Sequence, residues 1–325
     1  MAALRWAALV LALAPVAGLA QPARRALQWE EVTVSYNRED EAFARTALDA
    51  AKTVLPTLAG ALGLSRERPG RELPIRIDIA RRNRDFDQLV GQKTKPWVEG
   101  MALGGERRIV LKTLAPAVMR TVTAHELVHV LLDTAAQELG VEPPRWLHEG
   151  LAKLSADDFT QNDREVLGQA VLDHKLIPLS QLDAAFGGNS DQESLAYAES
   201  YTLVRFLHEL QPGGGVKQLL ANLALTGDVN RALLRTYGQP AVQLEREWLQ
   251  QTQTTYLKHG IPLTAELGIF AAMAVLALAA YAVQAGRRRL IRERLQEDER
   301  LRRMFGTVAD ETDEGTGPPE DDHLI

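Results

Sequence analysis

The spacing of apolar side chains divides the first part of the chain into strands and a helix. Apolar and polar residues alternate over residues 31–36 and again over residues 73–80, as they do in strands that bury one face. Residues 40–64 between them are rich in Ala and Leu at helical spacing. Residues 98–102 and 108–111 flank a Gly-Gly pair, which indicates a hairpin.

The rest of the chain up to residue 257 has the spacing of helices. The stretch 119–132 carries apolar residues at helical spacing and contains neither Pro nor Gly. From Pro143 onward no segment alternates convincingly in the manner of a strand. Because strands come first and helices later, the pattern predicts an α+β domain.

Both ends of the chain carry apolar runs. Residues 1–20 contain Arg5, then an apolar run, then the small residues Gly18 and Ala20, which is typical of a secretory signal peptide cut after Ala20. An uncleaved N-terminal anchor is the alternative. Residues 267–285 contain no Asp, Glu, Lys, Arg or His and match the roughly 20 residues that a helix needs to cross a bilayer. A buried core helix is the alternative there, although no polar face marks one.

Basic residues predict the orientation of this span. Three arginines, residues 287–289, follow it at once, whereas Lys258 is the only nearby Lys or Arg before it. Positive charge favours the cytoplasmic side, so we expect a cytoplasmic C-terminus and an extracytoplasmic domain. Residues 287–303 are expected to form a helix on anionic lipid or a solvated extension of the span. The acidic residues 307–325 are expected to be disordered.

Composition narrows the range of functions. The net charge of -6 argues against a protein that binds nucleic acid. The absence of cysteine excludes disulfides, thiolate metal ligands and a cysteine nucleophile. A length of 325 residues, of which 46% are hydrophobic, is enough for one substantial domain with extensions.

One motif inside the stretch 119–132 points to metal chemistry. Residues 125–129 read His-Glu-Leu-Val-His. Side chains four residues apart share a helix face, so His125 and His129 can present two imidazole nitrogens to one metal ion. Glu126 can then reach a metal-bound water without being a ligand, and Zn²⁺ makes such a water a nucleophile near neutral pH. An ordinary surface helix is the alternative interpretation.

A zinc site needs a third protein ligand beyond the two imidazoles. In residues 143–152, which read PPRWLHEGLA, two prolines end one segment and open a new helix. Glu149 lies twenty residues after His129, far enough for this helix to fold back beside the first. Gly150 next to it would allow two helix backbones to approach closely, which favours Glu149 over its neighbours. The nearby alternatives are Asp133, Glu142 and His148.

Together the two motifs resemble those of the gluzincin zinc peptidases, most closely the bacterial peptidase MA-like families. Their pattern runs H-E-x-x-H, a short insert, then W-L-x-E-G-x-A, which this chain matches at residues 125–129 and 146–152. The likeness covers roughly residues 32–257, including residues 195–207 and an amphipathic helix around Trp248.

The resemblance implies a thermolysin-like catalytic core, in which a short mixed sheet packs on a helical lobe with the active-site helix between them. It also implies that His125, His129 and Glu149 bind Zn²⁺ and that Glu126 is the general base. A strand at the sheet edge would border the site and pair with an extended substrate, and residues 100–103 are the candidate. A plain structural hairpin is the alternative there.

The chain departs from the family pattern at two places. In thermolysin-like members an Asp after the third ligand braces a zinc histidine, but four residues after Glu149 this chain has Lys153. A brace normally fixes the ligand tautomer, and Asp133 or Asp157 could supply it. The related aminopeptidases carry Gly-x-Met-Glu-Asn at the edge strand, whose Glu holds the free amino terminus of the substrate. The segment 100–102 reads Gly-Met-Ala and has no such Glu, which favours endopeptidase action.

Peptide hydrolysis also needs a donor for the oxyanion. The resemblance implies a catalytic Tyr at the start of a helix after the third ligand. Tyr197 is the first candidate, ahead of Tyr201 and His208. Simple packing is the alternative, because two tyrosines four residues apart on a helix often pack against neighbours.

These patterns predict a membrane-anchored, extracytoplasmic zinc metallopeptidase that acts on peptide or protein substrates. The alternative is a peptide- or protein-binding module with a gluzincin fold that does not cleave. The expected organisation is a signal peptide over residues 1–20, a metallopeptidase domain over 28–258, a transmembrane helix over 267–286 and a cytoplasmic tail over 287–325.

Overall fold

The computed structural model describes residues 24–64, 74–257 and 263–306. The chain divides into two compact units, Met1–Gly260 and Ile261–Ile325, each of which is described by itself. The expected signal peptide and the acidic end of the tail lie outside the described residues.

A five-stranded sheet with the order β1-β2-β3-β5-β4 lies in the first unit. Its strands are β1 (Arg25–Trp29), β2 (Val32–Tyr36), β3 (Ile75–Ala80), β4 (Gly100–Leu103) and β5 (Arg108–Lys112). The central strands β2, β3 and β5 are parallel, and the edge strands β1 and β4 are antiparallel to their neighbours. Parallel strands need crossover connections, and α1 (Glu41–Ala61) makes the one from β2 to β3.

Burial explains the alternation read from the sequence. In β2, Val32 and Val34 are fully buried while the residues between them are partly exposed. The three isoleucines of β3 join the main core, which includes residues of α1 and α3 (Pro116–Leu139). Because neighbouring strand residues point to opposite faces, Ala80 and Val110 face the other way and pack with Phe86 of α2 (Asn83–Val90).

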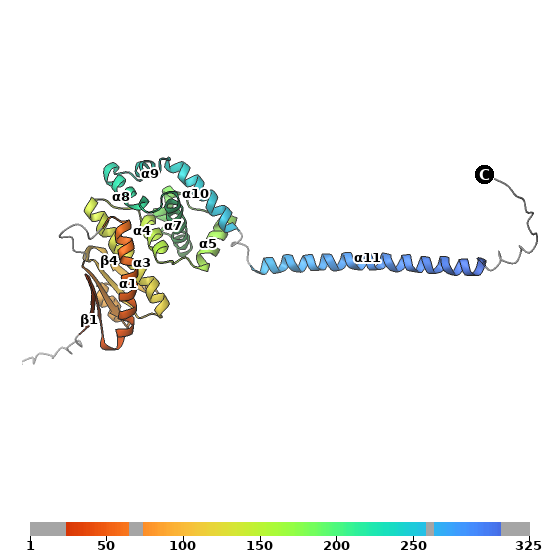
Figure 1. Ribbon diagram of the computed structural model, residues 1–325, viewed down its shortest axis with the longest axis horizontal. Coiled ribbons are helices and arrows are strands. Elements are labelled where there is room, and N and C mark those ends of the chain that lie inside the picture. Colours follow the sequence, from red (N-terminus) through yellow and green to blue (C-terminus); the bar gives the residue numbers. More distant parts are fainter. Residues whose placement is uncertain (1–23, 65–73, 258–262, 307–325) are drawn as a thin grey trace, which may run out of the picture. The chain divides into compact units, whose positions relative to one another are not determined.

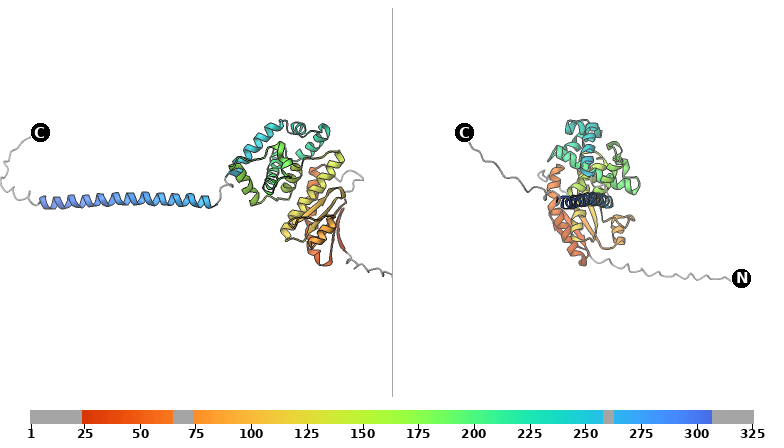
Figure 2. Two further views of the ribbon diagram at one scale, coloured as in Figure 1. Left: turned by 180° about the vertical axis from the view of Figure 1, so that it is seen from behind. Right: turned by 90° about the vertical axis from the view of Figure 1, so that its right-hand side faces the viewer.

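A helical lobe follows α3. Its helices are α4 (Arg145–Ser155), α5 (Gln161–Leu172), α6 (Leu179–Ala185), α7 (Ser190–Leu210), α8 (Gly215–Thr226), α9 (Val229–Tyr237) and α10 (Ala241–Tyr256). The sheet with α1 lies at one end of the unit, and α8, α9 and α10 lie at the other (Figures 1 and 2). Trp248 of α10 is 1% exposed and donates its indole N–H to Thr202 of α7 at 3.0 Å, which ties the last helix to the lobe.

The architecture confirms the prediction of an α+β fold that is mostly helical with a small mixed sheet. Three details differ from the sequence prediction. Strand β1 is largely exposed, and α2 buries only Phe86, so neither leaves a clear apolar pattern. Helix α7 begins at Ser190 rather than at Tyr197, because the side chain of Asn189 caps it by accepting the N–H of Gln192.

The second unit contains one long helix, α11 (Leu263–Gly306). Within it, Phe270–Met304 is the one candidate membrane span among the described residues, by length and composition. Its apolar side chains are exposed: Phe270, Leu276 and Tyr281 are 67–70% exposed. The arginine-rich residues 287–303 continue the same helix without a break.

Candidate metal site

Helix α3 brings the two histidines of the motif together. Pro116 occupies its first turn, and the helix continues for 24 residues in all without interruption, so His125 and His129 lie one turn apart. Their rings are 5.0 Å apart, and each Nε2 atom faces the same carboxylate oxygen, Oε2 of Glu149, at 3.8 and 3.7 Å. The three side chains offer ligand atoms that all lie within 4.8 Å of one another.

Helix α4 carries Glu149 to this place. Its first turn is fixed by the carboxylate of Asp183, which accepts the backbone N–H of Trp146 at 3.0 Å. Gly150 lies against the backbone of Ser200 on α7, where a Cβ atom would collide. The prediction of close helix approach at Gly150 is therefore confirmed, and it leaves Glu149 only 9% exposed beside the histidines.

The three side chains fit a zinc ion. Two atoms that each lie 2.0–2.2 Å from a tetrahedral zinc are about 3.3–3.6 Å apart. The separations from Glu149 to the two imidazoles are only slightly larger, so small side-chain movements would complete the geometry. Two imidazoles and one carboxylate are also the ligand set of many catalytic zinc sites, which keep a fourth position open.

The charges of the cluster agree with that ligand set. Burial lowers the pKa of His129 to about 4, which keeps this imidazole neutral and its lone pair available. Burial alone would raise the pKa of Glu149, but the side chains of His125, His129 and Arg145 beside it hold this pKa below its ordinary value. Burial alone would lower the pKa of His125 as well, but the carboxylates of Glu149 and Glu126 outweigh it and raise this pKa above its ordinary value. His129 and Glu149 are therefore in the forms that bind metal, whereas metal binding would displace a proton from His125.

Glu126 lies beneath the edge strand β4. Gly100 of this strand packs so closely that a Cβ atom there would lie 2.9 Å from Cγ of Glu126. The backbone of Ala102 hydrogen-bonds the Glu126 carboxylate, yet burial prevails and raises its pKa to about 7. A carboxylate with this pKa can both accept and release a proton near neutral pH.

Tyr197 points to the same region from α7. Arg145 donates to its hydroxyl at 3.3 Å and also lies 3.5 Å from Oε1 of Glu149, so the phenol stands next to the carboxylate. The other two candidates lie elsewhere. Tyr201 stacks on Phe159 with ring centroids 4.0 Å apart, and His208 lines a separate pocket.

An unexpected carboxylate faces the outer nitrogen of His125. Asp158 places Oδ2 3.7 Å from Nδ1 of His125, and this buried Nδ1 has no hydrogen-bond partner among the described residues. The side chain of Lys153, which is buried, lies 3.9 Å from Asp158 and 3.3 Å from Asp163. Lys153, which stands where the family pattern has the bracing Asp, therefore contacts two acids of the segment after α4, and one of them, Asp158, faces His125.

Neither acid named from the sequence takes this position. Asp133 faces Nε2 of His148 at 3.8 Å rather than an imidazole of the cluster. Asp157 adopts a φ of 50° in the turn after α4, and the chain then presents the next residue, Asp158, to the histidine. In the sequence, only its position a few residues after α4 could have pointed to Asp158. The turn that directs its side chain to His125 leaves no recognisable sequence pattern.

A polar pocket of about 650 Å³ adjoins the cluster. Arg145 and His148 line it, together with Asp133, Glu142 and Asp183. Arg145 also pairs with Glu149 at 3.5 Å, and the ring of His148 stacks on that of His129, so the pocket lies beside the cluster.

The family model described as Peptidase MA superfamily matches residues 67–254, which include α3 and the helices of the lobe up to the last two residues of α10. None of the curated proteins matches the chain at a significant level.

Proposed function

The chain belongs to the Peptidase MA superfamily, and from that premise we propose that it is a zinc-dependent endopeptidase, anchored in a membrane with its catalytic domain outside the cytoplasm. The observation that carries the proposal is that the ligand atoms of His125, His129 and Glu149 lie close together. Glu126 directly follows His125 on helix α3. The family is typically zinc-dependent, and the ligand set agrees with that.

In this proposal His125, His129 and Glu149 hold Zn²⁺. The ion, when bound, would polarise the substrate carbonyl and make a water molecule more acidic. Asp158 orients the ring of His125 through Nδ1, so that its Nε2 stays directed at Glu149.

Glu126 acts as the general base. Its carboxylate takes a proton from water, and the oxygen then attacks the peptide carbonyl carbon. Glu126 next delivers this proton to the nitrogen of the departing amine, so the carboxylate is restored as the C–N bond breaks. Burial raises the pKa of Glu126 to about 7 without the ion, and the charge of a bound Zn²⁺ would lower it, so at neutral pH the carboxylate would be ionised and able to take the proton.

Tyr197 and β4 position the substrate. The hydroxyl of Tyr197, beside Glu149, can donate a hydrogen bond to the oxyanion that forms as the carbonyl is attacked. The edge strand β4 can pair with an extended peptide backbone, and the segment Gly100–Leu103 has no acid for a free amino terminus. Internal peptide bonds are therefore the favoured targets.

Anchoring follows from α11. Its apolar side chains are bare over a length that suits a bilayer, and arginines follow them. We propose that residues 267–286 span the membrane, that residues 1–20 are a cleaved signal peptide, and that residues 28–258 form the peptidase domain. Protease added to intact spheroplasts should then digest this domain and spare an epitope at the C-terminus; the reverse result would invert the topology.

The decisive experiment uses purified residues 21–260. This fragment should hold about one zinc per chain and cleave members of a library of peptides and unfolded proteins, and a chelator should abolish cleavage. Glu126→Gln should keep the metal and lose hydrolysis by about 10³-fold or more. The matched control Glu165→Gln changes an exposed helix carboxylate and should retain full activity.

Two results would contradict the proposal. A native domain without any zinc would remove the metal chemistry. Zinc binding with tight peptide binding but no cleavage would instead identify a binding module. The second outcome is disfavoured because Glu126 is present and buried, and its pKa is raised toward neutral pH. A module that only binds peptides does not need such a carboxylate.

A further inference from the structure

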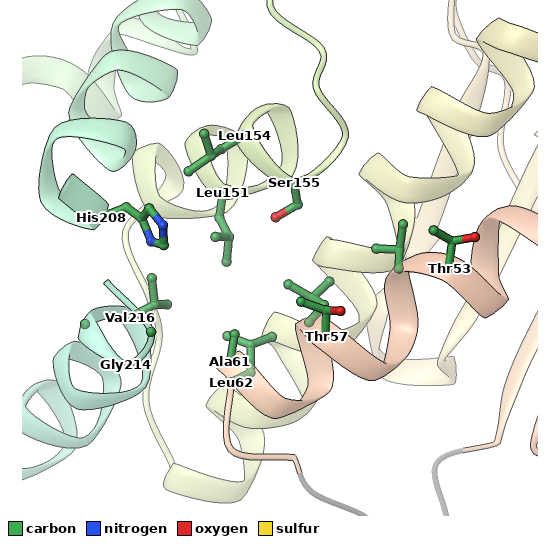
Figure 3. Close-up of a pocket in the computed structure, with 14 residues that line it drawn as sticks. Thr53, Thr57, Ala61, Leu62, Leu151, Leu154, Ser155, His208, Gly214 and Val216 are labelled. Carbon is green, nitrogen blue, oxygen red and sulfur yellow. The ribbon is translucent and has the colours of Figure 1, made fainter. Parts of the chain in front are cut away.

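A second pocket lies on the side of α4 that faces away from the candidate metal site. It has a volume of about 420 Å³ and is walled by α1, α4, the end of α7 and the start of α8 (Figure 3). Leu151 follows Glu149 by two residues, so the two side chains leave α4 on nearly opposite sides. The same helix therefore presents a carboxylate to one site and apolar groups to the other.

The pocket is elongated along α1. Two rows of side chains at four-residue intervals form its wall there: Thr53, Thr57 and Ala61 in one row, and Val54, Leu58 and Leu62 in the other. Nine helical residues rise about 14 Å, so the pocket runs for that distance along the helix. Leu151, Leu154 and Ser155 of α4 point into it from the opposite side (Figure 3).

Its lining is apolar and carries no acid. Leu58, Leu62 and Leu151 are buried at its floor, and Leu154 and Val216 are half-buried at its walls. The polar groups of the lining are three hydroxyls, one imidazole and the backbone of a glycine run. The volume falls within the range of about 300–1,000 Å³ that is usual for pockets that bind small molecules.

One end of the pocket suits an anion. His208 and the segment 213–216 lie together there (Figure 3). Helix α8 starts at Gly215, and its N-cap Gly214 supplies no side-chain hydrogen bond, so the first N–H groups of the helix are uncapped by a side chain. These N–H groups carry the partial positive charge of a helix N-terminus.

We propose that this pocket binds one fatty acyl chain, with its carboxylate toward His208 and the start of α8. The apolar lining extends for about 14 Å along α1, which suits an unbranched chain better than a compact ring system. Burial of the chain supplies the binding energy, and the absence of acids in the lining allows an anionic end group. The site is separate from the peptidase chemistry, so binding is expected whether or not the protein cleaves peptides.

The test measures binding of a fluorescent fatty acid to residues 21–260, since the buried core of the first unit lies between Val32 and Tyr256. Thr57→Asp places a charge at the exposed rim of the pocket and should weaken binding at least about tenfold. The matched control Thr254→Asp changes an exposed threonine on α10 and should leave affinity unchanged. Failure of the wild type to bind, or equal binding by both variants, overturns the proposal.

Two further measurements identify the end group of the ligand and its source. His208→Gln should weaken binding of the acid and leave binding of the fatty alcohol of equal length unchanged; equal binding of acid and alcohol by the wild type would overturn the anionic end. Displacement of the probe by free fatty acid alone identifies a free acid, and displacement by phosphatidylglycerol vesicles identifies an acyl chain of intact lipid. Displacement by neither contradicts the proposed site.

Discussion

Two buried glutamates on neighbouring helices have opposite properties. Glu149 of α4 is 9% exposed, and the imidazoles and Arg145 around it hold its pKa below the ordinary value. Glu199 of α7 is fully buried, accepts one hydrogen bond from the N–H of Ile177 at 2.9 Å, and has no described partner for its other oxygen. Burial raises its pKa to about 8.

The difference separates a candidate site from a structural carboxyl group. Burial makes both groups costly to ionise, and only nearby cations or hydrogen-bond donors can offset this cost. Glu149 has these partners and is available as an anionic ligand, whereas Glu199 is expected to remain a neutral acid at pH 7. The cluster around Glu149, rather than burial itself, marks the place where chemistry is expected.

Replacement of each glutamate by glutamine should give the largest contrast. Glu149→Gln removes an anionic ligand, so zinc affinity should fall by more than about 100-fold, beyond the usual effect of an outer contact, and hydrolysis should be lost with it. Glu199→Gln should leave both unchanged. Competition with a chromophoric chelator measures the affinities, and equal losses in the two variants would contradict the assignment of Glu149 as a ligand.

The tyrosines of α7 sharpen the comparison further. Tyr197 stands beside Arg145 and Glu149, while Tyr201 stacks on Phe159. Tyr197→Phe should lower kcat by about 100-fold with little change in KM, because an oxyanion donor acts mainly in the transition state. Tyr201→Phe keeps the ring stack and should retain the wild-type kcat. Steady-state kinetics on a peptide from the library screen decide the matter, and a full rate for Tyr197→Phe would leave packing as its role.

Substitution of Asp158 should have a smaller effect on zinc affinity than substitution of Glu149. Asp158→Asn removes the charge next to Nδ1 of His125 and should weaken zinc binding by about 10–100-fold. Asp157→Asn, one residue earlier in the same turn, is the control and should change little. Chelator competition again provides the measurement. If both variants bind zinc as the wild type does, Asp158 has no positioning role.

The sequence predicted those parts of the fold and site that depend on periodicity. The alternation in β2 survives in the structure because one face of this strand is buried, and the isoleucines of β3 and the apolar residues around His125 survive because they join the main core. The proximity of Glu149 to the histidines followed from a motif spacing and from a glycine that permits close helix contact. Element β1 escaped prediction because it buries little apolar surface.

The contacts that depend on loops were not predictable in this way. Asp158 reaches His125 because Asp157 turns the chain through a positive φ, a conformation that no apolar pattern signals. The pocket along α1 likewise brings together residues of α1 and α8, which are far apart in sequence. Tyr197 was placed at a helix start, whereas Asn189 caps α7 two turns earlier.

The smallest effect concerns stability and tests Glu199 alone. Both the folded and the unfolded chain hold its proton at pH 4. As pH rises above the ordinary value of 4.5, the unfolded chain releases the proton while the folded chain keeps it up to about pH 8. The folded state then binds more protons, so Glu199 lowers the free energy of unfolding progressively across this window.

Glu199→Gln preserves the acceptor for Ile177 and removes the titration. The variant should therefore match the wild type at pH 4 and exceed its free energy of unfolding by about 1–2 kcal/mol at pH 5.5–6, with a larger excess at higher pH. Urea unfolding with excess chelator, which prevents any contribution from metal release, measures both curves. The control Glu165→Gln should follow the wild type, and parallel curves for Glu199→Gln and the wild type would show that Glu199 ionises normally despite its burial.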